Sequence, residues 1–402
     1  MNQPLPPGFR LDLDPSLKLL RPDLLAGGVP NRVLRLTGAG VQAWAALADR
    51  PVTTRAEGLL ARRLTDAGLA HPVPPDGAGP GHADVTVVVP VLDRAQELDR
   101  CLASIAGAVP VLVVDDGSAD PDAVAKVAAE HGARLVRREI NGGPAAARNT
   151  ALDALGPDDV VAFLDSDCVV PPGWLAPLLA HLADPLVAAV APRIVGTAAP
   201  TWAGRYTAAR GNLDLGAVSS RVRADARVAY VPTAALVARV SALRSVARGG
   251  YVFEPSLRYG EDVDLVWRLD AAGLRVRYQP EVEVRHHEPE RWRPLLARRF
   301  RYGTSAGPLA SAHPQLAAPL VLMPWPALAV AALLARRPVA AVGATAATAL
   351  TTRRLLRRAD VPTAGTTAAT LRGVHATWLG CGRYATQFAA PLTAAAVVAP
   401  GS

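Results

Sequence analysis

The alternation of apolar runs and amphipathic stretches between residues 85 and 164 constrains the fold of this chain most strongly. Short runs of Val, Leu and Phe bounded by turn residues indicate buried strands, and the stretches between them have the spacing of helices that bury one face. This order predicts an α/β fold with a doubly wound, mostly parallel sheet, whose ligands bind beyond the carboxyl ends of the strands. The expected strands cover 85–90, 111–114, 134–137 and 160–164, and the expected helices cover 95–105, 123–131 and 144–155.

Proline and glycine mark the clearest boundary in the chain. Residues 73–83 read Val-Pro-Pro-Asp-Gly-Ala-Gly-Pro-Gly-His-Ala, which is typical of a linker. We therefore expect a small module at 1–72, the α/β domain at 84–310 and an Ala-rich helical tail at 311–402.

The small module has its own pattern of strands and helices. Alternating side chains indicate two short strands, and Thr37 can cap the helix that follows the second of them. The expected elements are strands at 9–13 and 31–36, a turn at 26–30, a helix at 38–47 and a second amphipathic helix at 55–67.

Composition narrows the class of protein. The 402 residues are half apolar and carry a net charge of +8, which fits a phosphorylated substrate, an anionic membrane face or a nucleic acid. The three cysteines are far apart and lack metal-ligand spacing, so a reducing cytosol is expected. Residues 291–302 are basic with interleaved aromatics, but without a recognised nucleic-acid fold we expect no nucleic-acid partner.

Polar side chains follow the expected strands at their carboxyl ends. Asp116 lies in an Asp-Asp-Gly-Ser turn, where its carboxylate can accept a hydrogen bond from a base or ribose. The Gly-rich loop at 141–149 opens a helix, so its amides can meet an anion and Arg148 can reach a nucleotide. An ordinary turn and a solvated helix Arg are the alternatives. Asp165 and Asp167 end the last strand as either exposed caps or ligands of Mg²⁺ or Mn²⁺ carrying a diphosphate.

The second half of the chain offers a base and a further ligand. Glu261 and Asp262 begin a helix whose dipole stabilises negative charge, which alone explains an acid pair at this position. Strict alternation at 281–286 ends in His286, on the same strand face as two valines. His286 is therefore either a structural residue or a ligand of a metal or diphosphate.

The order of these motifs resembles that of inverting family 2 glycosyltransferases, which have a GT-A fold. Val-Val-Val-Pro, Val-Val-Asp-Asp-Gly-Ser, Asn-Gly-Gly with Ala-Arg-Asn, and Leu-Asp-Ser-Asp carry the resemblance, which spans 84–290. It implies transfer of a hexose from a nucleotide sugar, with UDP-glucose as the expected donor, to a hydroxyl acceptor. The implied nucleotide contacts are Pro90, Asp116, Arg148 and Asp165; the implied metal ligands are Asp167 and His286; and the implied base is Asp262.

Two further resemblances concern the acceptor. The module at 1–72 is similar to PqqD-like winged-helix domains, which implies that an edge strand binds an extended precursor peptide by β-augmentation; a plain cap on the next domain is the alternative. With this module, the whole layout resembles the glycosyltransferases of mycofactocin systems, which glucosylate a peptide-derived redox cofactor. Residues 288–292 resemble the Gln-x-x-Arg-Trp motif of processive members, but Glu288 replaces the Gln.

Other functions stay open at this point. A polysaccharide or lipid-linked glycan transferase at the membrane is the enzyme alternative, and a peptide-binding scaffold with an inactive fold is the non-enzyme alternative. Twenty uncharged residues at 316–335 and a second apolar run at 338–352 are each followed by arginines. They fit an integral hairpin, surface-lying helices or a plain bundle, and either membrane arrangement would hold the enzyme at the cytoplasmic face.

Overall fold

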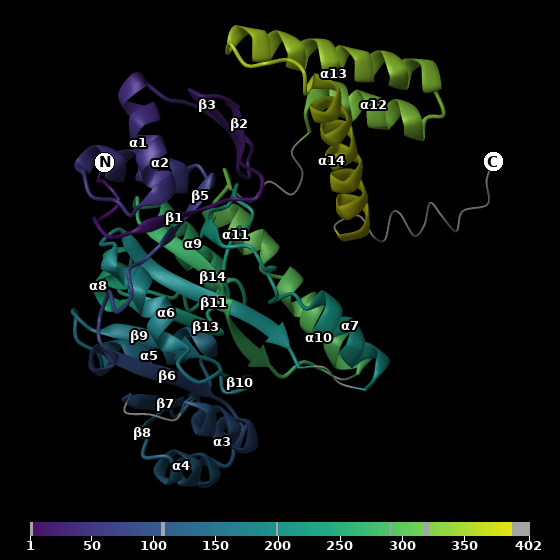
Figure 1. Cartoon of the computed structure of the whole chain (residues 1–402). Helices are drawn as coiled ribbons and strands as arrows, with labels where there is room; N and C mark the ends of the chain where they lie inside the picture. The colour runs from purple at the N-terminus through teal and green to yellow at the C-terminus, as the bar shows by residue number, and fades with distance from the viewer. Residues whose placement is uncertain (1–2, 106–108, 198–199, 290, 317–321, 388–402) are drawn as a thin grey trace, which may run out of the picture. The chain divides into compact units, whose positions relative to one another are not determined.

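The computed structural model comprises two compact units, residues 1–316 and 317–402, which we describe separately. Figure 1 shows the chain from purple at the N-terminus to yellow at the C-terminus. The structure describes all residues except 1–2, 106–108, 198–199, 290, 317–321 and 388–402.

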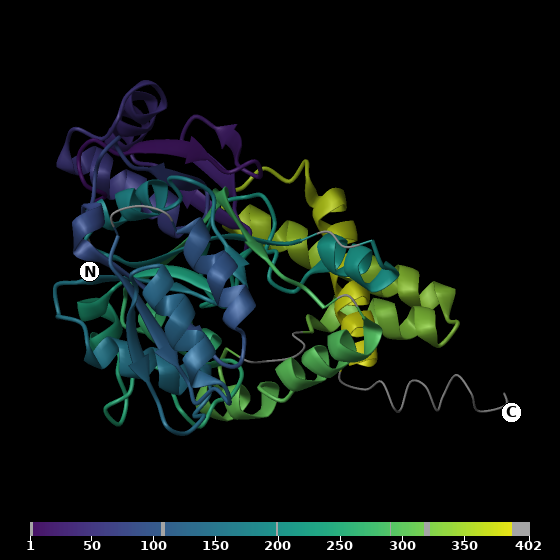
Figure 2. The same cartoon turned by 90° about the horizontal axis from the view of Figure 1, so that it is seen from below.

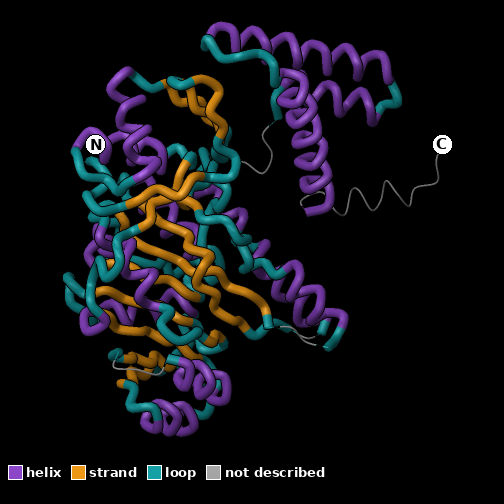
Figure 3. The backbone as a smooth tube through the Cα atoms, viewed as in Figure 1, coloured by secondary structure: helices purple, strands orange, loops and turns teal. Residues whose placement is uncertain are grey.

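A nine-stranded sheet forms the centre of the first unit (Figure 3). Its order is β10-β14-β11-β13-β9-β6-β7-β8, and β12 pairs with β14. β9, β6, β7 and β8 pair in parallel, whereas β13 is antiparallel to both of its neighbours. The α/β fold that the sequence predicts is therefore confirmed. The strands are β6 (Val85–Val91), β7 (Val111–Asp115), β8 (Arg134–Arg137), β9 (Val160–Leu164), β10 (Cys168–Val169), β11 (Val187–Gly196), β12 (Ser220–Val222), β13 (Ala235–Arg239) and β14 (Arg275–His286).

Helices connect these strands close to the predicted positions. α4 begins two residues earlier than expected, because the Asp120 side chain accepts a hydrogen bond from the Ala123 amide and Pro121 suits the first helical position. The helices are α3 (Ala95–Ser104), α4 (Pro121–Glu130), α5 (Pro144–Asp153), α6 (Leu175–Ala180), α7 (Trp202–Arg210), α8 (Val240–Ser245), α9 (Glu261–Ala271), α10 (Trp292–Gly303) and α11 (Ala306–Ala312).

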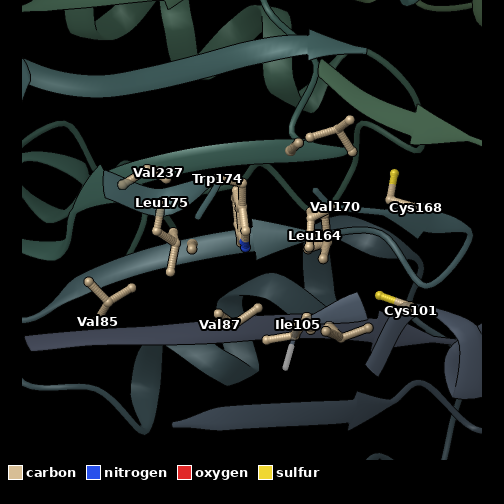
Figure 4. Close-up of a cluster of buried hydrophobic side chains, with 14 of the residues drawn as sticks. Val85, Val87, Cys101, Ile105, Leu164, Cys168, Val170, Trp174, Leu175 and Val237 are labelled. Atoms are coloured by element: carbon tan, nitrogen blue, oxygen red, sulfur yellow. The ribbon is translucent and has the colours of Figure 1, made fainter. Parts of the chain in front are cut away.

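The sheet and its helices enclose an apolar core (Figure 4). All five residues of β9 are buried, as expected for an apolar strand without alternation. Cys101 and Cys168 are buried in the same cluster and are free thiols. Burial raises the pKa of both thiols, so these cysteines pack as apolar side chains.

The N-terminal module has two small sheets and two helices. Thr37 caps the first helix as predicted, and Thr54 with Glu57 forms a capping box on the second. The sequence prediction of two strands was incomplete, because the structure has three more, at 18–21, 24–27 and 70–73. The strand at 24–27 includes the first residues of the expected turn. β1 (Arg10–Leu13) pairs with β5 (Ala70–Val73), and β2 (Lys18–Arg21), β3 (Leu24–Gly27) and β4 (Arg32–Arg35) form the second sheet beside α1 (Gly38–Asp49) and α2 (Arg55–Asp66).

Ion pairs join this module to the α/β domain, and both views place the two side by side (Figures 1 and 2). The buried guanidinium of Arg62 donates to both carboxylate oxygens of Asp184 at 2.7 Å. Asp66 at the end of α2 accepts from Arg221 and Arg275 at 2.7 Å each. The buried pair of Arg62 with Asp184 requires a fixed geometry, because an unpaired buried charge is costly.

The second unit contains α12 (Pro324–Leu334), α13 (Pro338–Arg358) and α14 (Thr366–Gln387). Part of the first apolar run, residues 317–321, lies outside the described residues. None of the helices in the described part of the chain is both long enough and apolar enough to cross a membrane.

Candidate active site

Three acidic side chains surround Arg148 at the carboxyl end of β9. The Arg148 guanidinium on α5 donates to Asp165 at 2.7 Å and to Glu261 on α9 at 2.9 Å. Asp262 follows Glu261 in the first turn of α9. Burial alone would lower the pKa of Arg148, but the negative charges of Asp165, Glu261 and Asp262 raise it. The fold thus assembles a buried cation with three acids from three distant segments.

The start of α9 determines where Asp262 lies. Gly260 has φ +85°, and a Cβ there would lie 2.9 Å from side-chain atoms of Leu309 on α11 and of Ser305 just before α11. Glycine is therefore required both by the backbone conformation and by the close packing. Helix α9 therefore begins directly after Gly260, and Glu261 and Asp262 are its first two residues.

The two acids of this pair differ in their surroundings. Glu261 is buried against Arg148, and its pKa rises to about 7 because of burial and the neighbouring Asp262 charge. Asp262 is partly exposed, and its carboxylate accepts a hydrogen bond from the Val263 amide at 2.8 Å. Burial raises the pKa of Asp262, although that hydrogen bond and Arg148 act in the opposite direction. A partly exposed carboxylate with a raised pKa has the properties of a general base.

Asp167 and His286 form a second group at the same edge of the sheet. The antiparallel pairing of β10 with β14 puts Cys168 opposite His286. This register brings the His286 Nε2 to 3.3 Å from the Asp167 Oδ1, while its Nδ1 lies 3.1 Å from the Glu288 Oε1. Burial would lower the pKa of His286, but hydrogen bonds and charges from Asp167 and Glu288 raise it to about 9.

Further charged residues complete this group. Glu288 is buried and accepts from Arg298 of α10 at 3.2 Å, and the Arg94 Nη1 donates to the Asp167 Oδ2 at 2.5 Å. Burial raises the pKa of Asp167, but His286, Arg94 and Arg298 lower it overall. Sequence reasoning missed Arg94 and Arg298, and treated Glu288 only as a departure from a motif. The position of Arg94 just after the first strand of the sheet was the available signal.

Asp116 is more fully engaged within the protein than its sequence position indicated. Its buried carboxylate accepts hydrogen bonds from the Arg138 Nε at 2.7 Å and from the Gly142 and Gly143 amides at 3.1 and 2.7 Å. Gly117 has φ +83°, and a Cβ there would lie 2.8 Å from the Asn141 nitrogen. Asp116 therefore holds the Gly-rich loop against the end of β7.

Pro90 lies within β6, as the expected strand at 85–90 placed it, and is in register with Val114 of β7. Pro90 is partly exposed, and the loop that contains Asp93 begins two residues after it. Its ring lacks a donor, but β6 pairs with β9 only as far as Val88, so Pro90 lies where β6 has one paired neighbour, as on an edge strand.

The donor atoms beside Asp167 are compatible with a divalent metal. Within the part of the chain that the structure describes, no group of three or more His, Cys, Asp or Glu side chains has the geometry of a metal site. Mg²⁺ and Mn²⁺ sites that hold a phosphate need only one or two protein ligands, and the phosphate and water complete the coordination shell. The carboxylate of Glu288 on the second ring nitrogen of His286 is the outer partner typical of a metal-binding histidine. Asp167 and His286, with Glu288 behind the histidine, therefore fit a site for Mg²⁺ or Mn²⁺.

Comparison with known proteins identifies the family. Residues 86–241 match the model of glycosyl transferase family 2. The pre-mycofactocin glycosyltransferase of Mycobacterium tuberculosis is 45% identical over 331 residues, which cover 80% of this chain and 68% of that protein. The chain belongs to glycosyl transferase family 2. The resemblance that the sequence motifs indicated is thus confirmed.

More distant proteins share smaller parts of this glycosyltransferase. The succinoglycan biosynthesis protein ExoU of Rhizobium meliloti is 31% identical over 208 residues, covering 48% of this chain and 59% of that protein. A crystal structure of GalNAc-T7 with UDP, GalNAc and Mn²⁺ covers 55% of this chain and 46% of its own, with a TM-score of 0.40 and 16% identity. Staphylococcus aureus TarS covers 51% of this chain and 36% of its own, with a TM-score of 0.41 and 18% identity.

Proposed function

We propose that this glycosyltransferase moves a hexose from UDP-glucose to a hydroxyl group of pre-mycofactocin, with inversion at the anomeric carbon. The observation that carries the proposal is the 45% identity to a pre-mycofactocin glycosyltransferase, which extends over 80% of this chain. The edge strands of the N-terminal sheet, β2 and β4, expose Leu19 and Val33. Such edges can add an extended peptide as a further strand, which supports a peptide-derived acceptor.

The residues of the site divide the chemistry between two groups. Asp262 is the proposed base that takes the proton from the acceptor hydroxyl, since it is partly exposed and has a raised pKa. Arg148 neutralises part of the negative charge around it and holds Asp165 toward the nucleotide. One displacement that inverts the anomeric carbon needs a single base for the acceptor and stabilisation of the leaving group.

Asp167 and His286 are the proposed ligands of a divalent metal at the leaving group. When bound there, Mg²⁺ or Mn²⁺ would neutralise charge that develops on the departing diphosphate. Glu288 fixes the His286 ring so that its Nε2 faces Asp167. Asp116 shapes the Gly-rich loop, and we propose that this loop and Pro90 border the nucleotide.

A polysaccharide or lipid-linked glycan is the second candidate acceptor. The observation that favours it is the 31% identity to a succinoglycan biosynthesis protein over 48% of this chain. The same catalytic residues would serve either acceptor, so only the acceptor itself separates the two functions.

The full chain, incubated with UDP-glucose and Mn²⁺, is expected to release UDP faster when pre-mycofactocin is added. Other nucleotide sugars and glycan acceptors serve as the comparison panel. Replacement of Asp167 by Ala should reduce this rate by a factor of roughly 10 to 100, because a proposed metal ligand is lost. Asp153→Ala, at an exposed position on α5, is the matched control and should retain the rate. Stimulation by a glycan but not by pre-mycofactocin would favour the second acceptor.

The dependence of the rate on pH should reflect the raised pKa of Asp262. The base acts only when deprotonated, so activity falls as the pH drops through its pKa, and burial moves this loss above the range of an ordinary aspartate. The negative charge of Asp165 also raises the pKa of Asp262, so Asp165→Asn should shift the acidic limb to lower pH. Measuring kcat between about pH 4 and 9 for both proteins checks this expectation. An acidic limb that stays in place in the variant would contradict it.

A further inference from the structure

Arg94 is held at the sheet edge by an unusual backbone conformation. Asp93 before it has φ +56°, a left-handed value that non-glycine residues rarely adopt. Two hydrogen bonds stabilise this conformation: the Asp93 amide donates to the Ser118 Oγ at 2.9 Å, and the Asp93 Oδ1 accepts from the Ala119 amide at 2.7 Å. The loop after β7 thus fixes the loop after β6, from which Arg94 reaches across to Asp167.

The ion pair between Arg94 and Asp167 joins an exposed side chain to a largely buried one. The Asp167 side chain is 10% exposed, whereas the Arg94 side chain is 48% exposed. The two carboxylate oxygens have different neighbours, because Oδ1 faces His286 and Oδ2 accepts from Arg94. The guanidinium can therefore leave Asp167 without opening the core, while Asp167 cannot follow it.

A divalent cation and Arg94 compete for the same carboxylate. A metal on Asp167 would put two positive charges beside the guanidinium, and like charges at such short range repel strongly. The diphosphate of a nucleotide sugar, bound through that metal, supplies the nearest new negative charge. A guanidinium fork is well suited to phosphate oxygens.

We propose that Arg94 is an exchangeable cation of this site: it neutralises Asp167 and transfers to the diphosphate of the nucleotide sugar when a divalent metal takes its place on that carboxylate. This inference rests on the proposed function, because it takes Asp167 as a metal ligand. Arg94 would then act twice, first as a competitor of the metal and then as a ligand of the donor.

The two roles predict effects of opposite sign in Arg94→Ala. Binding of Mn²⁺ alone to the full chain, followed by the electron paramagnetic resonance signal of free Mn²⁺, should become about two- to fivefold tighter, as expected for the loss of a partly exposed ion pair. Binding of UDP at saturating Mn²⁺, followed by calorimetry, should become roughly five- to tenfold weaker, because a charge-assisted contact to phosphate is lost. Arg94→Lys keeps the charge and should shift both affinities less.

Arg134→Ala is the matched control, since Arg134 is exposed on β8, at the opposite edge of the sheet from β10. It should leave both affinities unchanged. The proposal is overturned if Arg94→Ala leaves Mn²⁺ binding unchanged, undetectable or weaker, or if UDP binding does not weaken. Asp167→Ala separates this failure from failure of the proposed function: if that variant retains Mn²⁺ affinity, the metal assignment itself is wrong.

Discussion

Replacement of Asp262 by Asn is expected to slow glycosyl transfer by a factor of about 10² to 10⁴, the usual contribution of a general base. The amide cannot accept the proton of the acceptor hydroxyl, but it keeps the size of the carboxylate. It also removes a negative charge beside Glu261. The free energy of unfolding should therefore be retained or raised while kcat falls, and UDP affinity should stay close to that of the unchanged protein.

Asp264→Asn provides the contrasting variant on the same helix. Asp264 is buried and accepts hydrogen bonds from Arg268 and His313 at 2.8 Å each. The substitution leaves a buried guanidinium without its counter-charge, so stability should fall by about 3 kcal/mol. Thermal unfolding and steady-state kinetics on both variants separate a catalytic from a structural acid. An unchanged kcat in Asp262→Asn would contradict the assignment of Asp262 as the base.

Replacement of Arg148 by Met is expected to lower the free energy of unfolding by about 3 to 5 kcal/mol. The side chain is 3% exposed and pairs with Asp165 and Glu261, so its loss leaves their charges uncompensated in a desolvated site. Chemical denaturation followed by circular dichroism measures the change. Arg134→Met, at an exposed position on β8, is the control and should alter stability by less than about 0.5 kcal/mol.

The double variant Arg148→Met with Glu261→Gln tests the cause of this loss. If unpaired charge dominates, neutralising Glu261 should recover part of the stability lost in Arg148→Met alone. A double variant less stable than either single variant would instead indicate that the guanidinium matters through its packing against Phe253, whose ring centroid lies 5.8 Å away.

The predicted strands and helices from residue 85 to 164 agree with the structure because their signal is local. An apolar strand without charge, such as Val160–Leu164, is stable only when both of its faces are buried. Helices on the two faces of a mostly parallel sheet provide that burial. The cap at Thr37 is equally local, since a hydroxyl and an amide three residues apart decide it. The short strand at 24–27 was missed because it is buried on both faces and therefore lacks alternation, and because its Ala-Gly end has the composition of a turn.

The sequence by itself determined the fold class and the chemical types of the acids at the strand ends. It also indicated the family, because motif order along the chain is a property of the sequence alone. The tertiary structure decided which charges neutralise one another: Arg148 with Glu261, His286 with Glu288, and Arg94 with Asp167. Except for His286 and Glu288, these partners lie far apart in the chain. Burial and Coulomb interactions depend on distance in space, and therefore on the packed strands and helices rather than on sequence spacing.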